Sequence, residues 1–181
     1  MTSLRLSSCG LNGTFPEKVF RILTLQTIDL SNNELLQGSL PDFLPNGSLQ
    51  SLLLSGTGFS GALPDSNGNL AMLSRIDLFG CNFSGSIPNS MAILTQLVYL
   101  NMSFNNFTGP IPSFNMAKNL TQINLSHNYL RGQITSTDWK HLSNLVNLDL
   151  GSNSLYGSIP VSLFSLSSLQ KLQLSNNQFS G

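Results

Sequence analysis

The sequence is built on a repeat of about 24 residues, and this periodicity limits the folds that the chain can adopt. Each copy carries two apolar residues separated by one residue, and the second members of these pairs are 24, 24, 24, 24, 23, 25 and 24 residues apart. Such spacing predicts one structural unit, repeated eight times, in which each copy packs against its neighbours. The pairs are Leu4/Leu6, Ile28/Leu30, Leu52/Leu54, Ile76/Leu78, Leu100/Met102, Ile123/Leu125, Leu148/Leu150 and Leu172/Leu174.

Each apolar pair predicts a short strand with one buried face, and strands of neighbouring repeats are expected to lie in parallel. Three residues after each pair comes a turn position, usually Asn, whose amide can satisfy backbone groups that the turn removes from the sheet. Two residues further on, a column of Leu or Phe is expected to stack inside the coil. The turn residues are Cys9, Asn33, Thr57, Cys81, Asn105, Asn128, Asn153 and Asn177, and the inner column is Leu11, Leu35, Phe59, Phe83, Phe107, Leu130, Leu155 and Phe179.

Most repeats continue with Gly, an apolar residue and Pro, and then with a return segment that has apolar residues at helical spacing. This spacing predicts short 3₁₀ or helical turns on the outer side of the coil. Trp139 opens one return segment, and we expect it to pack against the outer core rather than to serve as an exposed anchor.

Composition argues against several classes of function. Only 9% of residues are charged, against about 25% in an ordinary soluble domain, and the formal net charge is zero. We therefore expect no nucleic-acid partner, because the chain lacks a basic stripe. His127 and His141 are too isolated to indicate a metal site, and the segment Gly56–Gly61 matches a dinucleotide-binding spacing only because repeat positions coincide. No serine lies in a nucleophile elbow, so we expect no enzyme, no catalytic residue and no cofactor.

The two cysteines hold the same turn position three repeats apart. At about 4.8 Å for each stacked strand, Cys9 and Cys81 are expected to lie roughly 14 Å apart. A disulfide needs Cα atoms within about 7 Å of each other, so both residues are predicted to be free thiols.

Seven Asn-x-Ser/Thr sequons occur in the chain. They can arise by chance in a repeat that is rich in Asn, Ser and Thr, or they can mark N-glycosylation of a secreted protein. We favour an extracellular location. The candidate glycosylation sites are Asn12, Asn46, Asn82, Asn101, Asn106, Asn119 and Asn124.

The pattern Leu-x-x-Leu-x-Leu-x-x-Asn-x-Leu resembles the leucine-rich repeat, and the tail Gly-x-Ile-Pro, as in Asn105–Pro112, is similar to its plant-specific subtype. The resemblance implies an α/β solenoid: a right-handed curved coil with a parallel sheet on the concave face and short 3₁₀ or helical segments outside. The irregular segments Gly13–Lys18, Leu36–Pro41, Asn46–Ser48 and Asn89–Ala92 are similar to plant receptor-like proteins of the Verticillium-wilt resistance type.

For function, the resemblance implies a ligand- or partner-binding segment of a plant cell-surface receptor-like protein in pathogen recognition and defence signalling. Its expected partners are a protein or peptide of pathogen origin and a co-receptor kinase, at the extracellular side of the plasma membrane. Alternatives are an extracellular inhibitor of pathogen cell-wall-degrading enzymes secreted to the wall, the ectodomain of a receptor kinase, and a structural wall protein. Only parts outside this chain are expected to contact the membrane.

The whole chain, residues 1–181, is expected to form one array without the cysteine-containing caps that usually close such extracellular arrays. We therefore expect an internal fragment of a longer ectodomain. Produced alone, such a piece should aggregate or fray, because both end repeats expose apolar columns and strand edges.

Ligand-binding residues are expected on the concave face, where most positions that flank the apolar pairs are small and polar. Departures from that background gather in the third to sixth repeats, where aromatic side chains and an Arg resemble the core of a protein interface. An alternative is that Phe79 and Phe104 only cover the corner between strand and turn, and a glycan on Asn101 or Asn124 would cover part of the surface. We call the following six residues the candidate surface: Leu53, Arg75, Phe79, Tyr99, Phe104 and His127.

Overall fold

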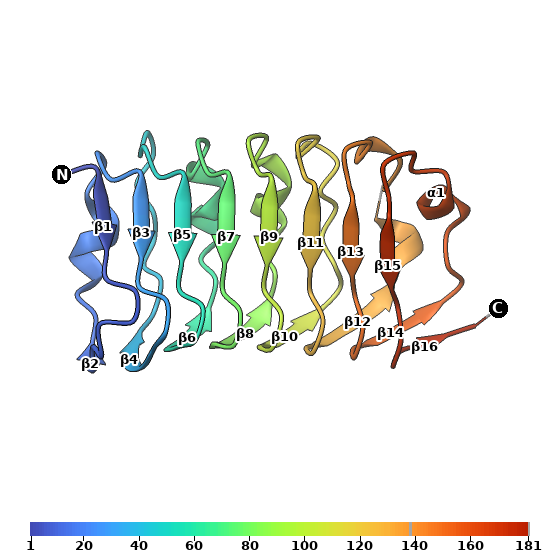
Figure 1. The fold of residues 1–181 in the computed structure, drawn as a ribbon. Helices are drawn as coiled ribbons and strands as arrows, with labels where there is room; N and C mark the ends of the chain where they lie inside the picture. The colour runs from blue at the N-terminus through green and yellow to red at the C-terminus, as the bar shows by residue number, and fades with distance from the viewer. Residues whose placement is uncertain (138, 181) are drawn as a thin grey trace.

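A computed structural model describes residues 1–137 and 139–180 as an elongated array of repeats, with the two termini at opposite ends (Figure 1). Eight parallel strands, one from each repeat, form a first sheet whose strand order follows the chain. This confirms the predicted strand in each repeat. The strands are β1 (Ser3–Arg5), β3 (Thr27–Asp29), β5 (Ser51–Leu53), β7 (Arg75–Asp77), β9 (Tyr99–Asn101), β11 (Gln122–Asn124), β13 (Asn147–Asp149) and β15 (Lys171–Gln173).

Equivalent residues of neighbouring repeats lie side by side in this sheet. Leu52 of β5 pairs with Ile76 of β7, which in turn pairs with Leu100 of β9. These central residues are buried, with exposed fractions of 2%, 4% and 0%. The residues on either side of each central residue therefore point away from the core and form the concave face.

A second parallel sheet of eight strands lies along one edge of the array, at the bottom of Figure 1. We did not predict it, since strands of two to six residues with glycines among them show little alternation. The extended backbone after each turn needs hydrogen-bond partners and finds them in the equivalent segment of the next repeat. The strands are β2 (Gly13–Thr14), β4 (Asn33–Gly38), β6 (Thr57–Ala62), β8 (Asn82–Ser86), β10 (Asn106–Gly109), β12 (Tyr129–Gln133), β14 (Ser154–Gly157) and β16 (Gln178–Phe179).

The turn asparagines satisfy backbone groups at the turn, as predicted, and they also connect successive repeats. The Asn105 Oδ1 atom accepts a hydrogen bond from the N–H of Phe83 at 2.9 Å. Its Nδ2 donates to the carbonyls of Leu78 at 2.7 Å and Met102 at 3.1 Å. Asn105 is only 6% exposed, so this one amide satisfies backbone groups from two repeats inside the molecule.

The inner apolar column is confirmed in most repeats, but its prediction at Leu35 is wrong. Leu35 is 70% exposed and Leu36 is 4% exposed, so Leu36 takes the buried position. The extra residue in this repeat shifts the pairing of β4 with β6 between Asn33 and Gln37. Gly38 then lies so close to the ring of Phe59 that a Cβ atom would come within 2.8 Å of it, so only glycine fits there.

Short helical segments cover the side of the array opposite the first sheet, as expected (Figure 1). Trp139 is fully buried there and donates a hydrogen bond from Nε1 to the carbonyl of Ile134 at 2.8 Å, which confirms its packing role. The segments are the 3₁₀ helices η1 (Glu17–Arg21), η2 (Asp65–Asn69), η3 (Asn89–Ile93), η4 (Ile134–Ser136) and η5 (Trp139–His141), and the α-helix α1 (Val161–Phe164).

Both cysteines are free thiols, as predicted. Cys9 is exposed, whereas Cys81 is buried and donates a hydrogen bond from Sγ to the carbonyl of Leu54 at 3.1 Å. Burial raises the pKa of the Cys81 thiol, despite hydrogen bonds from Thr57 that lower it. Cys81 therefore has a structural role in the turn.

Candidate binding surface on the concave face

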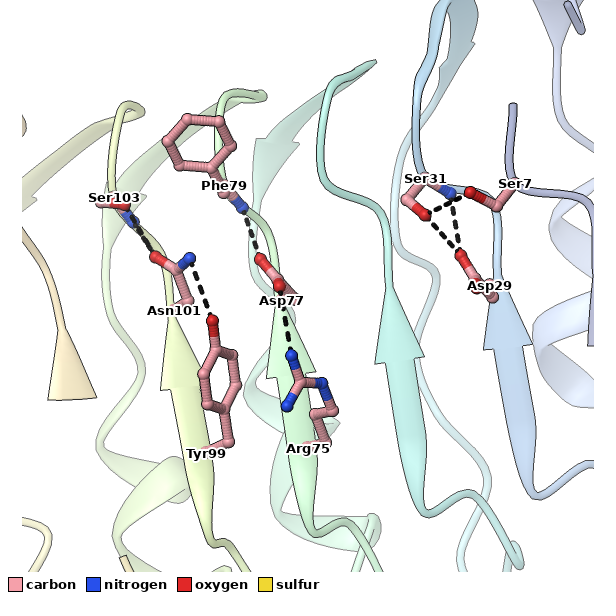
Figure 2. A network of polar contacts seen from close by, with 9 residues as sticks. All are labelled: Ser7, Asp29, Ser31, Arg75, Asp77, Phe79, Tyr99, Asn101 and Ser103. Carbon is pink, nitrogen blue, oxygen red and sulfur yellow. Dashed lines mark hydrogen bonds and ion pairs between the residues drawn. The ribbon is translucent and has the colours of Figure 1, made fainter. Parts of the chain in front are cut away.

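The polar side chains on the concave face hold the ends of the strands. The Oδ1 atom of Asp29 accepts hydrogen bonds from the N–H of Ser31 at 3.1 Å and from its hydroxyl at 2.6 Å (Figure 2). Asn101 makes the same pair of contacts with Ser103, at 3.2 and 2.7 Å. This recurring side-chain-to-backbone motif stabilises the exit from five strands, β3, β7, β9, β11 and β13. Much of the polar background therefore has a structural function.

Arg75 and Tyr99 lie on neighbouring strands and contact each other directly. The guanidinium carbon of Arg75 is 3.8 Å from the centre of the Tyr99 ring, and one guanidinium nitrogen is 3.7 Å from the Asp77 carboxylate. The Nδ2 atom of Asn101 donates to the Tyr99 hydroxyl at 3.4 Å (Figure 2). Cation–π attraction from Arg75 and the hydrogen bond from Asn101 hold the Tyr99 ring in one orientation.

Asp77 belongs to the same network. Its carboxylate is mostly covered, and burial raises the pKa of Asp77 above the usual range of a carboxyl group. The N–H of Phe79, the charge of Arg75 and the hydroxyl of Tyr99 oppose that effect and lower the pKa. Asp77 thus balances the charge of Arg75 on the concave face.

Phe79, Phe104 and His127 form a second group at the corner where strand meets turn. The rings of Phe79 and Phe104 meet edge to face with centroids 5.3 Å apart, and Phe104 stacks on His127 at 4.0 Å. All three remain exposed, with 42% for Phe79 and 49% for Phe104. They form a continuous aromatic ridge across three repeats.

Phe104 occupies a strained backbone position. Its φ angle is +56°, in the left-handed region, where a side chain costs roughly 1–2 kcal/mol. The equivalent position has a positive φ in all eight repeats, and four of them place there a residue that tolerates this conformation better than Phe: Asn32, Gly56, Gly80 and Asn176. The repeat imposes this conformation, so Phe104 keeps an exposed aromatic ring at a position where Gly or Asn would be less strained.

The structure thus gathers five of the six predicted residues into two groups, Arg75 with Tyr99 and Phe79 with Phe104 and His127. Leu53 lies half-buried on β5, beside Asp77 of β7. It borders the first group without a ring or charge contact to it.

Five of the seven sequon asparagines are exposed, whereas the two on the concave face are half-buried. The Oδ1 atom of Asn124 accepts hydrogen bonds from the N–H and hydroxyl of Ser126, at 3.0 and 2.8 Å. Asn101 and Asn124 lie opposite each other on β9 and β11. The exposed sites are Asn12, Asn46, Asn82, Asn106 and Asn119.

A hollow of about 200 Å³ opens on the concave face beside Tyr99. We did not single out its residues beyond Tyr99, although the position before each apolar pair changes from Ser or Thr in the first three repeats to larger side chains in the last five. That change is the sequence signal that could have identified the site. We call it the concave hollow, and its lining side chains are Tyr99, Gln122, Asn124, Asn147, Asp149 and Lys171.

Among residues 1–137 and 139–180, no three His, Cys, Asp or Glu side chains come together as metal ligands would. Within the same residues, no helix combines the length and the apolar character that crossing a membrane requires.

Comparison with known proteins agrees with this geometry. A sequence model of the Leucine Rich Repeat matches residues 24–46, 48–70, 72–94, 96–115, 119–142 and 144–166. Receptor-like protein 39 of Arabidopsis thaliana is 33% identical over 186 residues, which cover 98% of this chain and 18% of the relative. Receptor-like protein 6 of the same plant is 45% identical over 78 residues, covering 43% of this chain and 8% of the relative. The chain therefore spans a fifth or less of the length of these two relatives.

Solved structures share the fold over the whole chain. The crystal structure of a TDR receptor superposes with a TM-score of 0.89 at 29% identity, covering 100% of this chain and 31% of that one. The Arabidopsis receptor kinase HAESA, solved with the peptide hormone IDA and the co-receptor SERK1, gives a TM-score of 0.87 at 34% identity, covering 94% of this chain and 28% of that one.

Proposed function

The chain belongs to the leucine-rich repeat family, and from this premise we propose that it is a ligand- or partner-binding segment of a plant cell-surface receptor-like protein. Its similarity to Arabidopsis proteins named receptor-like proteins supports the proposal, as does the HAESA structure, which contains a peptide hormone and a co-receptor. The array lies on the extracellular side of the plasma membrane in this proposal. It binds a protein or peptide ligand of pathogen origin and signals through a co-receptor kinase.

The aromatic ridge is the observation that carries the proposal. Three exposed rings form a chain of contacts across three repeats, Phe79 with Phe104 and Phe104 with His127, and the last two are held at positive φ angles. Rigid aromatic side chains and Arg are the residue types that contribute most binding energy at protein interfaces. Arg75 and Tyr99, fixed against each other beside the ridge, extend the surface across the concave face.

We also propose that the five exposed sequon asparagines carry N-glycans in the secreted protein. Asn82 and Asn106 are exposed on the second sheet, whereas the candidate surface belongs to the first sheet and the turns that follow it. Glycans there leave the concave face accessible to a ligand. A glycan on Asn101 or Asn124 would cover it.

A plant expressing the receptor that contains this chain provides the test. Leaves are treated with fractionated culture fluid of a pathogen, and the oxidative burst is measured for the parent and for a triple variant, Phe79→Ala, Tyr99→Ala and Phe104→Ala. We expect at least one fraction to elicit an oxidative burst in leaves that carry the parent receptor. The burst should be at least tenfold weaker in leaves that carry the triple variant, because truncation of an interface anchor costs about 2 kcal/mol or more of binding free energy.

The matched control changes three exposed residues on other faces, Leu35→Ala, Tyr129→Ala and Phe164→Ala. This control should respond as the parent does, at an equal amount of protein on the cell surface. An undiminished response in the triple variant would reject the candidate surface.

The ectodomain of a receptor kinase is a second candidate, because TDR and HAESA match the chain closely in structure. The gene sequence beyond this chain distinguishes the two. A membrane span with a short tail supports a receptor-like protein, and a kinase domain supports a receptor kinase. A stop after a cysteine-containing cap would instead support the soluble inhibitor.

A further inference from the structure

The concave hollow differs in chemistry from the aromatic ridge. It spans the last four strands of the first sheet, where Gln122 pairs with Tyr99, Asn147 with Gln122, and Lys171 with Asn147, and it reaches the strand ends at Asn124 and Asp149. Phe79 and Phe104 follow the ends of their strands. The hollow and the ridge are therefore separate regions of one face.

Tyr99 forms one wall of the hollow. Arg75, from the preceding strand, covers one side of its ring at 3.8 Å, while the other lining residues come from the following strands. The Tyr99 ring stands between them, as Figure 2 shows for the side toward Arg75. The hydrogen bond from Asn101 to its hydroxyl fixes the ring further, so the hollow has a rigid aromatic wall.

Besides Leu100, Ile123 and Leu148, the hollow is lined by several neutral amide residues. Gln122, Asn124 and Asn147 each carry both a donor and an acceptor. The Oδ1 atom of Asn124 is used by Ser126, which leaves its Nδ2 group to donate. These amides suit a ligand whose groups both donate and accept hydrogen bonds, as hydroxyl groups do.

Charge and size limit the ligand further. The hollow contains one acidic side chain, Asp149, and one basic side chain, Lys171, so its formal charge is zero. Its volume of about 200 Å³ is smaller than the roughly 300–1,000 Å³ of ordinary small-molecule pockets. It therefore suits a small, neutral unit of a longer ligand that extends along the array.

We propose that the concave hollow binds a sugar unit of a neutral oligosaccharide, which stacks on Tyr99 and forms hydrogen bonds to Gln122, Asn124 and Asn147. A pyranose ring combines a flat face of C–H groups with hydroxyl groups at its rim, and both features match this site. A peptide backbone supplies the hydrogen bonds but lacks a flat apolar face beside them. The ridge remains available for a protein ligand.

The test measures direct binding of cellohexaose, a neutral chain of six glucose units. The protein is produced without N-glycans, so that the sequon at Asn124 stays unmodified, and binding is followed by titration calorimetry and saturation-transfer NMR. We expect saturable binding. Tyr99→Ala should weaken it about tenfold, because the aromatic stacking is lost.

Tyr129→Ala is the matched control, since Tyr129 is exposed on the second sheet. It should bind cellohexaose as the parent does. Asn147→Ala is a second test variant, independent of Tyr99, and should also weaken binding. Circular dichroism melts confirm that each variant is folded.

Three results would overturn the inference. The first is no binding of either cellohexaose or mannohexaose, and the second is binding that Tyr99→Ala and Asn147→Ala leave unchanged. The third is equal competition by the neutral peptide acetyl-Ser-Asn-Ser-amide, which would reassign the hollow to a peptide.

Failure of this inference can be distinguished from failure of the proposed receptor function. A double variant, Phe79→Ala and Phe104→Ala, should lose the leaf response and keep cellohexaose binding. Asn147→Ala should weaken binding of the sugar, whatever the outcome of the leaf assay.

Discussion

At the scale of the single residue, Phe104 and Phe107 lie three residues apart in one repeat but have different roles. Phe104 is 49% exposed with a φ angle of +56°, whereas Phe107 is fully buried and stacks on Phe83 with ring centroids 6.3 Å apart. The first side chain adds strain to the fold, and the second fills its core.

Exchange of Phe104 for Asn should therefore change the free energy of unfolding by less than about 1 kcal/mol. The strain relieved, roughly 1–2 kcal/mol, offsets the lost ring contacts, about 0.5–1.5 kcal/mol for a pair. Phe107→Ala should cost about 3–5 kcal/mol, since it leaves a cavity. Urea unfolding of the two variants measures both. A large loss for Phe104→Asn would show that the ridge is structural.

Asp77 makes a contribution to stability that depends on pH. Burial raises its pKa in the folded state above that of the unfolded chain, so folding favours the protonated form. That contribution is present at low pH and is lost as the pH rises through the folded pKa.

The parent should therefore lose stability relative to Asp77→Asn as the pH increases from about 4, the ordinary pKa of Asp, toward neutrality. Urea unfolding of both proteins at a series of pH values gives this difference. If the parent instead became more stable relative to Asp77→Asn as the pH rises, the effect of the Arg75 charge on the pKa of Asp77 would be larger than the effect of burial.

At the scale of the structural element, the turn and the second sheet depend on one turn asparagine in five of the eight repeats. Asn128 repeats the contacts of Asn105: its Oδ1 accepts from the N–H of Phe107 at 2.9 Å, and its Nδ2 donates to the Met102 carbonyl at 3.0 Å. Each turn asparagine thus joins its own repeat to the preceding one.

Asn105→Ala should destabilise the protein by about 2–3 kcal/mol, because buried backbone groups at Phe83 and Leu78 lose their partner. Asn106→Ala is the matched control. Its side chain is exposed, and we expect a change within about 0.5 kcal/mol. Thermal unfolding of unglycosylated protein compares the two, and equal effects would contradict the assigned role of the turn amide.

At the scale of the whole molecule, stability comes from contacts between neighbouring repeats, and each end repeat has one neighbour within the chain. Apolar residues equivalent to fully buried ones are only partly buried at the ends. These are Leu4, Leu6, Leu11, Leu172, Leu174 and Phe179.

Backbone amides of β1 and β15 should therefore exchange with deuterium faster than those of β7, β9 and β11. Hydrogen exchange followed by mass spectrometry measures this gradient. Uniform protection across all eight repeats, together with a sharp melt of a monomer, would show that the array unfolds as one unit.

In the regular repeats, the sequence alone determined which side chains face the core and which face solvent. Regular spacing placed Leu100 and Phe107 inside and Tyr99 and Phe104 on the candidate surface, because the position of a residue within a repeat sets the direction of its side chain. The buried Trp139 and the free Cys81 followed from the same pattern.

Only the tertiary structure decided how the repeats meet. The shift that buries Leu36 instead of Leu35, the second sheet, the stacking of Arg75 on Tyr99 and the concave hollow all arise between residues about 24 positions apart. They depend on pairing register and on side-chain orientation across the gap between two repeats. A local periodic pattern fixes neither of these.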